Sequence, residues 1–305
     1  MKKIYLILAH KSPEQLEKQI NALFDEQSKF YIHIDLKSDL NLFNDLKKIP
    51  NVVLIKERVD CIWGDFNIIT ATLNLMKNVI KNHNEGFCIL MSGNDYPIKS
   101  RKFINSFLSK NSDKIFIDLK EAEKVWPTFN QRIEKYRINI SSQRGNALQL
   151  KQGITINTLK HYIRGRINLT DLKRILLKKR KINIKMKFYG GSQWWAMNVC
   201  NLNNVCDFVK KNERQLFDFF KYSHLPDEFF FHSIIMHLIE NGIQMEIQES
   251  LTYVNWKRKN CSLPVTFKTI DYNELIEQPP NKLFARKFDI NSDKQILDII
   301  DKNLN

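Results

Sequence analysis

Three polar segments follow apolar runs in the first third of the chain. They are residues 10–12 (His-Lys-Ser), 35–38 (Asp-Leu-Lys-Ser) and 92–97 (Ser-Gly-Asn-Asp-Tyr-Pro). Such side chains can hydrogen-bond a nucleotide, but Ser, Asp and Asn are also common helix caps and turn formers. Any single one of them fits either interpretation. Their shared position, each after an apolar run, favours a nucleotide-binding cleft.

The sequence lacks the common phosphate-binding and metal-binding motifs. It has no Gly-x-x-x-x-Gly-Lys-Ser/Thr loop, no Gly-x-Gly-x-x-Gly turn, no His-Glu-x-x-His and no Cys-x-x-Cys. No two aspartates are two positions apart, so the Asp-x-Asp pair that holds a divalent ion in many sugar-nucleotide enzymes is also absent. A sugar transferase with this sequence would have to neutralise the diphosphate in another way.

The pattern of apolar residues predicts the elements that would position these segments. Short apolar runs predict strands at 4–9, 30–35, 52–55, 87–91 and 114–118, and helical spacing predicts helices near 13–25, 66–82 and 101–108. This alternation favours an α/β fold, with a mainly parallel sheet flanked by helices. Such sheets bind ligands at the carboxyl ends of their strands, where the polar segments are expected.

The composition is that of a globular protein with one unusual segment. The chain has 305 residues, 43% apolar and 27% charged, with five cysteines that we expect to be reduced. It has no run of about 20 apolar residues, so we expect it to be cytoplasmic. Its net charge is +15, of which residues 160–187 carry +10. Such a balance favours an anionic partner: a nucleotide, a membrane surface or a nucleic acid.

Leucines within the basic segment fall near helical spacing. They are Leu169, Leu172, Leu176 and Leu177, and Lys and Arg lie between and after them. This pattern predicts a basic amphipathic helix that could hold the protein at the inner face of the plasma membrane, near lipid-linked acceptors. The alternative is a charged, solvated insertion with no partner.

Several short blocks occur in one order along the chain. They are Asp35 within 32–38, Trp63-Gly64, residues 92–99, Gly191-Ser192-Gln193-Trp194, Pro226-Asp227-Glu228 and Phe284-Ala285-Arg286-Lys287-Phe288. This ordered set resembles the core-2/I-branching β-1,6-N-acetylglucosaminyltransferases and the peptide O-xylosyltransferases of glycosyltransferase family 14. The resemblance implies a GT-A-like nucleotide-sugar transferase fold, inversion at the anomeric carbon and no need for a metal ion or other cofactor.

The resemblance also implies how a single domain of residues 1–305 divides. Residues 1–118 form the nucleotide-binding half. Residues 119–290 form the acceptor and catalytic half, including the basic helical insertion 160–187, and residues 291–305 form a C-terminal helix. Glu228 is then the base that takes the acceptor proton, from the start of a helix that we expect to run from Pro226 to about Asn241. Capping is the other explanation for an acid at that position.

The expected donor-binding residues are mostly basic. By resemblance, Arg286 and Lys287 supply the charge that a metal would otherwise bring to the diphosphate, and Lys268 lies near the same site. An exposed basic pair with no ligand is the alternative for Arg286 and Lys287. Asp35 and Lys37 match the position where relatives contact the nucleoside, and Asp95 either braces its loop or touches the donor.

The acceptor-binding residues are expected from aromatic and charged side chains: Arg132, Trp194, Trp195, Asp227 and Trp256. Adjacent side chains on a strand point in opposite directions, so at least one of Trp194 and Trp195 could instead pack in the core.

We therefore expect an inverting, metal-independent transferase that moves N-acetylglucosamine, or else xylose, from a UDP-sugar to a glycan hydroxyl. The Lys-, Asn- and Ile-rich composition suits a bacterial protein and a role in surface polysaccharide synthesis. Two alternatives remain open: a nucleic-acid-binding protein that uses residues 160–187, and a catalytically inactive glycan-binding relative. No recognised nucleic-acid module is present, so we expect no nucleic-acid partner.

Overall fold

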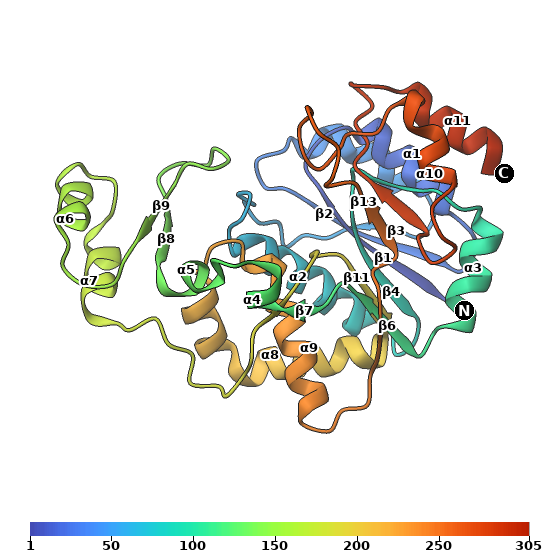
Figure 1. The fold of residues 1–305 in the computed structure, drawn as a ribbon. Coiled ribbons are helices and arrows are strands. Elements are labelled where there is room, and N and C mark those ends of the chain that lie inside the picture. Colours follow the sequence, from blue (N-terminus) through green and yellow to red (C-terminus); the bar gives the residue numbers. More distant parts are fainter. Residues whose placement is uncertain (305) are drawn as a thin grey trace.

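The computed structural model describes residues 1–304 and is built around a seven-stranded mixed sheet (Figure 1). The strands are β1 (Lys3–Ala9), β2 (Ser28–Ile34), β3 (Val52–Leu54), β4 (Phe87–Ser92), β6 (Lys114–Ile117), β11 (Trp195–Asn198) and β12 (Glu246–Gln248), in the order β12-β6-β11-β4-β1-β2-β3. Only β11 is antiparallel to its neighbours within this sheet. The predicted mainly parallel sheet is confirmed.

Alternating side chains of the strands build two cores, one on each face of the sheet. From β1, Ile4 and Leu6 face α2 (Asn67–Asn82), α8 (Val199–Phe220) and α9 (Phe230–Glu240). Tyr5 and Ile7 face α1 (Pro13–Leu23), the 3₁₀ helix η1 (Leu40–Lys48) and α3 (Arg101–Lys110). Both faces are apolar because helices cover both, as the continuous apolar runs predict.

The C-terminal third adds a small sheet beside the main one. It consists of β13 (Thr252–Val254), β14 (Phe284–Arg286) and β5 (Asp95–Pro97), in that order. The antiparallel pairing of β14 with β5 sets Arg286 opposite Asp95. The 3₁₀ turn η3 (Thr269–Asp271), α10 (Tyr272–Ile276) and α11 (Gln295–Leu304) form a third core cluster with this sheet. α11 is the expected C-terminal helix.

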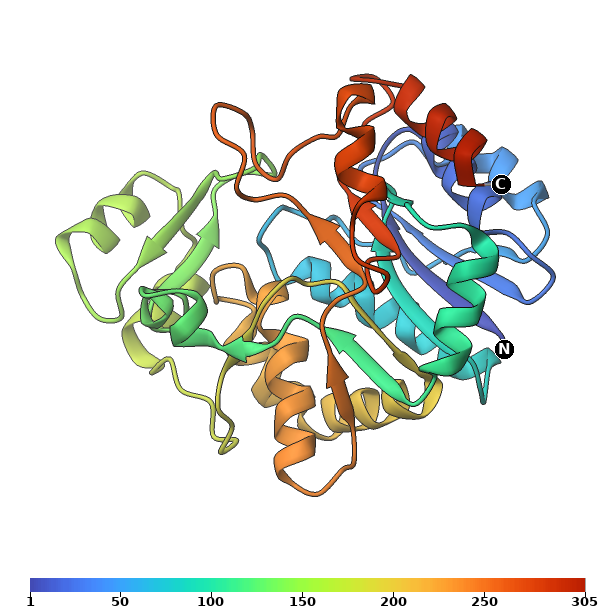
Figure 2. The same ribbon diagram turned by 45° about the vertical axis from the view of Figure 1, so that its right-hand side comes forward.

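Residues 120–190 contain a segment that projects from the body of the molecule, as Figures 1 and 2 show, and that we call the projecting part. It contains α4 (Ala122–Val125), α5 (Phe129–Glu134), β8 (Tyr136–Asn139), β9 (Ala147–Leu150), α6 (Ile156–Ile163) and α7 (Leu169–Leu177). β7 (Lys120–Glu121) pairs with β10 (Tyr189–Gly190) at its base. The predicted amphipathic helix is α7, but Leu172 and Ile175 on it are buried in a small core with Tyr136 and Tyr222.

The helix expected to start at Pro226 begins later. Pro226–Glu228 is a 3₁₀ turn, η2, and α9 starts at Phe230. The break has a backbone cause: Phe229, between the turn and the helix, lies outside the helical region at φ −145° and ψ −5°, and Leu225 before the turn has a left-handed φ of 52°. Glu228 therefore lies at the end of a tight turn just before the helix, which corrects the predicted position.

All five cysteines are free. In the described part of the chain, no helix is both long and apolar enough to cross a bilayer.

Candidate active site

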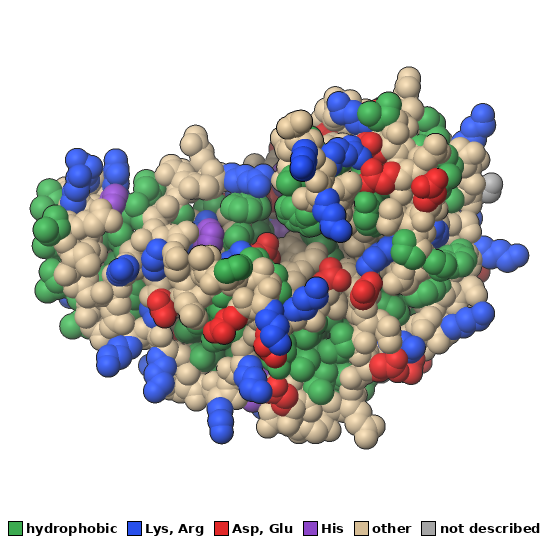
Figure 3. All heavy atoms as spheres, in the orientation of Figure 1, with side chains coloured by type: hydrophobic (Ala, Val, Ile, Leu, Met, Phe, Trp, Pro, Cys, Tyr) green, Lys and Arg blue, Asp and Glu red, His purple; other side chains and the backbone are tan. Residues whose placement is uncertain are grey.

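A cavity of about 1320 Å³ lies where β6, β12 and β14 end. It is lined by residues after β6 (Asp118 to Lys120), before β11 (Gly190 to Trp194), on η2 (Asp227, Glu228) and at the end of β14 (Arg286). Figure 3 shows the surface hollowed between the projecting part and the body, with acidic and basic side chains around the opening. The volume exceeds that of most single-ligand pockets, so two substrates fit together.

Two glycines hold the turn that carries Glu228. The Gly191 amide donates to the Glu228 carbonyl at 3.0 Å. A Cβ on Gly191 would lie 2.0 Å from the Asp118 carbonyl oxygen, and one on Gly190 would lie 2.4 Å from the Trp126 ring. The backbone before β11 packs so closely on these neighbours that only glycine fits at either position.

The Glu228 side chain is paired with Arg132. Arg132 Nη1 donates to Glu228 Oε2 at 2.7 Å, and the guanidinium lies over the Trp126 ring at 3.9 Å. Burial raises the pKa of Glu228 above its ordinary value, and the positive charge of Arg132 opposes that rise. A carboxylate in this setting can accept a proton at the edge of the cavity.

Asp227 is the more perturbed acid of the turn. Its Oδ1 is buried and has no hydrogen-bond partner among the described residues. Burial raises the pKa of Asp227 to about 7, and the charge of Glu228 adds to the rise. Two adjacent carboxyl groups at one cavity, both with raised pKa values, are typical of a site that handles protons.

Across the cavity lies Arg286, beside Asp95 and Trp194. Arg286 Nε is 3.7 Å from Asp95 Oδ1, and its guanidinium lies over the Trp194 ring at 4.3 Å. Arg286 Nε is buried without a hydrogen-bond partner among residues 1–304. Asp95 is fully buried and accepts from the Ser92 amide at 2.9 Å and the Ser92 hydroxyl at 2.7 Å. It braces the loop and holds Arg286, without lining the cavity.

The two expected lysines near Arg286 are placed differently. Burial lowers the pKa of Lys287, and the nearby charges of Arg144 and Arg286 lower it further. Several cations thus converge where an anion would relieve their repulsion. Lys287 follows the lining residue Arg286 but is not itself part of the cavity lining, and Lys268 is exposed at the start of η3, also outside the lining. Among residues 1–304, no group of three or more His, Cys, Asp or Glu side chains is arranged to hold a metal ion.

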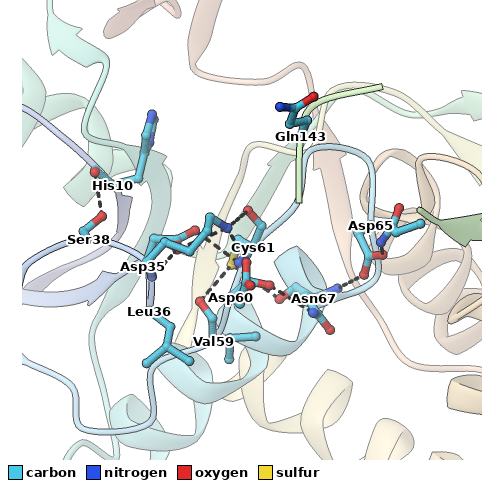
Figure 4. Close-up of polar contacts among 12 residues, drawn as sticks. His10, Asp35, Leu36, Ser38, Val59, Asp60, Cys61, Asp65, Asn67 and Gln143 are labelled. Carbon is cyan, nitrogen blue, oxygen red and sulfur yellow. Dashed lines mark hydrogen bonds and ion pairs between the residues drawn. The ribbon is translucent and has the colours of Figure 1, made fainter. Parts of the chain in front are cut away.

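Asp35 and Lys37 lie outside the cavity lining, in a network with residues 59–61 (Figure 4). The Asp35 carboxylate accepts from the Lys37 amide at 2.9 Å and from the Cys61 amide at 3.1 Å. Lys37 Nζ contacts the Asp60 carboxylate and the Cys61 carbonyl. These bonds fix the loop after β2 against the chain leading to α2, and the Lys37 side chain stays exposed.

Four of the five tryptophans line the cavity: Trp63, Trp126, Trp194 and Trp256. The fifth, Trp195, is buried in the core with its ring 5.9 Å from that of Phe231, so the structure does not bring it to the cavity. Trp194 lies just before β11, and both rings pack in the core on the same face of the sheet, but only Trp194 also reaches the cavity.

Trp63, Trp126 and Arg144 are among the cavity residues that the sequence analysis missed. The Trp126 ring packs against the guanidinium of Arg132, and the guanidinium of Arg144 lies over the Trp63 ring at 4.4 Å. Trp63 was present in one of the ordered blocks, which was the only signal for it. Trp126 and Arg144 belong to the projecting part, and nothing in their local sequence sets them apart.

A comparison with protein-family models matches residues 4–277 to the Core-2/I-branching enzyme family. Curated relatives include xylosyltransferase 2 of Homo sapiens, 27% identical over 323 residues, covering 98% of this chain and 33% of that protein. Xylosyltransferases of Ciona intestinalis (24% identical; 98% and 34% covered) and Drosophila pseudoobscura pseudoobscura (26%; 90% and 30%) also match. The chain spans about a third of the length of these animal proteins.

Among solved structures, a protein of Bacillus anthracis assigned as a glucose-1-phosphate thymidylyltransferase, in complex with sucrose, aligns with a TM-score of 0.34 and 9% identity. The alignment covers 81% of this chain and 86% of that one. Nothing about this chain is inferred from a similarity of that size.

Proposed function

The chain belongs to the Core-2/I-branching enzyme family, and from this membership we propose that it is an inverting glycosyltransferase of GT-A-like fold using a UDP-sugar. One observation carries the proposal: a paired, partly buried carboxylate, Glu228, and a partly buried arginine, Arg286, line one cavity. The first can take a proton and the second can hold a diphosphate. In an inverting transfer the base acts on the acceptor hydroxyl at one face of the anomeric carbon, and the positive charge acts on the diphosphate that leaves from the opposite face.

In the proposed reaction, Glu228 is the base. The acceptor hydroxyl oxygen attacks the anomeric carbon from the face opposite the diphosphate, and its proton passes to the Glu228 carboxylate. The bond from the anomeric carbon to the diphosphate oxygen breaks, and its electron pair leaves with the UDP. A positioned base of this kind contributes about 10²–10⁴-fold to the rate.

Arg286 and Lys287 are proposed to hold the departing diphosphate. Arg286 offers a fixed fork of N–H donors, and Asp95 behind it sets the direction of that fork. Lys287 adds a point charge whose lowered pKa reflects burial and crowding by other cations, which a bound phosphate would relieve. We propose that these side chains take the place of a divalent ion.

The nucleoside is proposed to lie against the loop that Asp35 stabilises. Because the Asp35 oxygens already accept two backbone amides, we assign Asp35 to shaping this loop and leave direct contact to Lys37. The exposed face of Trp256 and the ring of Trp194 are proposed to pack against the sugar rings of the acceptor.

For the donor, the names of the relatives favour xylose, and N-acetylglucosamine is the second choice. For the acceptor we propose a glycan, with surface polysaccharide synthesis in a bacterium as its setting. The animal relatives do not test that setting.

The experiment is a thermal shift and turnover measurement with UDP, UDP-xylose and UDP-N-acetylglucosamine, each with and without EDTA. We expect UDP to stabilise the protein equally in both buffers and one UDP-sugar to be consumed. Glu228→Gln should lose about 10²–10⁴-fold in turnover and still bind UDP. Glu249→Gln is the matched control, because Glu249 lines the cavity with its side chain 77% exposed and should keep its activity.

Other outcomes would contradict the proposal. UDP binding without any turnover indicates an inactive glycan-binding relative. Tight, salt-sensitive binding of RNA or DNA without UDP binding indicates a nucleic-acid-binding protein.

A further inference from the structure

The far end of the projecting part carries bare aliphatic side chains. We call residues 151–170, which include α6, the insertion tip. Ile154 is 74% exposed, Ile156 89% and Ile163 82%. Single exposed apolar residues are ordinary on a protein surface, but three isoleucines this exposed within ten residues are not.

These side chains form one surface because of the helix period. Ile156, Leu159 and Ile163 are three and four residues apart on α6 and so share one face. The same helix buries Thr158, and the following segment buries Ile167 in the core of the projecting part. That core is complete with the inward face of α7, so no described element covers the outer face of α6.

The insertion tip that carries the outer face of α6 contains basic residues and no acidic residue. Residues 151–170 contain Lys151, Lys160, Arg164 and Arg166 and not one Asp or Glu. Lys160, Arg164 and Arg166 are exposed and pair with no acidic residue that the structure describes. Figure 3 shows the hydrophobic and basic side chains together at this end of the molecule.

Three of the basic residues on and just after α7 make contacts with the body, whereas Lys173, Lys179 and Lys181 are exposed. Arg174 and Lys178 pair with Asp218, at 3.1 and 3.4 Å. Arg180 turns inward and donates to the Ile133 and Phe219 carbonyls. On α7 itself, Leu172 is buried and Leu176 partly buried in the core of the projecting part, whereas Leu169 and Leu177 are exposed. The exposed isoleucines of the tip lie beside cations that have no acidic partner among the described residues.

We propose that the insertion tip docks on an anionic membrane surface. The outer face of α6 enters the boundary between headgroups and acyl chains, and Lys160, Arg164 and Arg166 lie among anionic headgroups. Apolar side chains on one face and Lys and Arg beside them are what a helix lying in a membrane interface requires. Each cation near such a surface strengthens binding about fivefold.

Other occupants fit these residues less well. A nucleic acid would use the cations and leave the isoleucines in water. A second copy of the chain would bring one acid-free patch against another and oppose like charges. Both are separate outcomes of the test.

Because the insertion tip is joined to an element that lines the cavity, membrane docking of the tip would also position the cavity. The tip follows β9 directly, and the β8–β9 turn carries Arg144, which lines the cavity. If the proposed glycosyl transfer is correct, a docked tip places the opening of the cavity beside Arg144 near the lipid surface. The docking itself does not depend on the reaction.

The test is flotation of the full chain with vesicles of phosphatidylcholine alone and of equal parts phosphatidylcholine and phosphatidylglycerol. We expect binding to the mixed vesicles only. Ile156→Glu/Ile163→Glu should weaken it at least tenfold, and so should Lys160→Glu/Arg164→Glu/Arg166→Glu. Ile270→Glu is the matched control: Ile270 is 88% exposed on η3, at the opposite end of the molecule, and its variant should bind as the wild type does.

Two further measurements keep the result interpretable. Each variant should retain the wild-type melting temperature and the UDP-induced shift, which shows that it is folded. Glu228→Gln should float with the mixed vesicles as the wild type does, so a wrong assignment of the reaction does not affect this test.

Three results would overturn the docking proposal. The first is no binding of the wild type to mixed vesicles at low salt. The second is equal loss in Ile270→Glu and in the tip variants. The third is a dimer in light scattering, or a complex with a short RNA, that the tip substitutions abolish while vesicle binding persists.

Discussion

The Arg132 guanidinium holds one oxygen of the Glu228 carboxylate, and no side chain within residues 1–304 pairs with the other. The contact, Nη1 to Oε2 at 2.7 Å, joins residues 96 positions apart in the sequence. It opposes the rise in pKa that burial causes and orients the carboxylate from the side of Trp126. We therefore propose that Arg132 positions Glu228 and sets its ionisation. Arg132 also lines the cavity, so the acceptor contact that the family resemblance implied stays a prediction.

Arg132→Gln should change the pH profile of the reaction. Glu228 must be ionised to accept a proton, and its pKa is already raised by burial. Without the opposing charge of Arg132, that pKa rises further. The acid limb of kcat/KM should move upward by about one pH unit or more, with activity recovering toward wild type at alkaline pH.

Arg132→Lys serves as the control for this measurement. It keeps the positive charge, and its acid limb should stay near that of the wild type. If Arg132→Gln lost activity equally at every pH, and the acid limb of kcat/KM stayed at its wild-type pH, Arg132 would have no influence on the ionisation of Glu228.

Lys287→Gln should weaken UDP binding about tenfold or more, because a partly buried cation is worth up to about 4 kcal/mol against a phosphate charge. Isothermal titration with UDP measures this. Lys268→Gln offers the contrast: Lys268 is exposed on η3, whereas Lys287 directly follows the lining residue Arg286, so the Lys268 variant should bind UDP as the wild type does. Turnover should also survive EDTA. Equal losses at both lysines, or activity that returns only with manganese, would refute the assignment of charge to this end of the cavity.

Local patterns predicted the elements of the fold well. The apolar runs and helical repeats of residues 4–118 correspond to β1 to β4, β6 and the helices between them, because each pattern reports burial on a face that the period defines. The turn at Pro226–Glu228 was mispredicted as helix. The helix is interrupted at Phe229, whose backbone lies outside the helical region, and no glycine or proline at that position warns of it.

The candidate site was only partly predictable from sequence. Glu228 and Arg286 could be named from their blocks, but their roles depend on partners that arrive through tertiary contacts: Arg132 from α5 and Asp95 from β5. The Trp194–Trp195 pair shows the same limit. Alternation along a strand predicts that the two rings separate, whereas both pack on the same face of the sheet and only Trp194 reaches the cavity.

Asp227→Asn should stabilise the protein at alkaline pH. In the folded state Asp227 keeps its proton up to a pH of about 7, whereas an unfolded aspartate loses it near 4. Between those values the folded state binds more protons, so this group lowers the free energy of unfolding as pH rises. Urea denaturation should show Asp227→Asn gaining about 1 kcal/mol at pH 8 and little at pH 5.

Asp218→Asn is the control of opposite sign. Although partial burial opposes it, pairing with Arg174 and Lys178 holds the pKa of Asp218 below its ordinary value. That carboxylate therefore stabilises the fold above about pH 4, and its loss should destabilise the protein at pH 8. An Asp227→Asn protein no more stable than wild type at pH 8 would mean that Asp227 is ionised at no cost in the folded state.

Trp256→Ala should impair use of the acceptor without impairing the donor. The Trp256 side chain is 58% exposed at the cavity, so its removal leaves no hole in a core, and the melting temperature should not change. Losing one aromatic face against a sugar ring costs about 1 kcal/mol, which raises the acceptor KM roughly fivefold or more. The donor KM and the UDP-induced thermal shift should remain at wild-type values.

Trp195→Phe provides the comparison, because the Trp195 ring is buried beside Phe231 away from the cavity. This substitution should lower the melting temperature and leave the acceptor KM unchanged. If the two substitutions affected the acceptor KM equally, the cavity face of the tryptophans would have no part in recognising the acceptor.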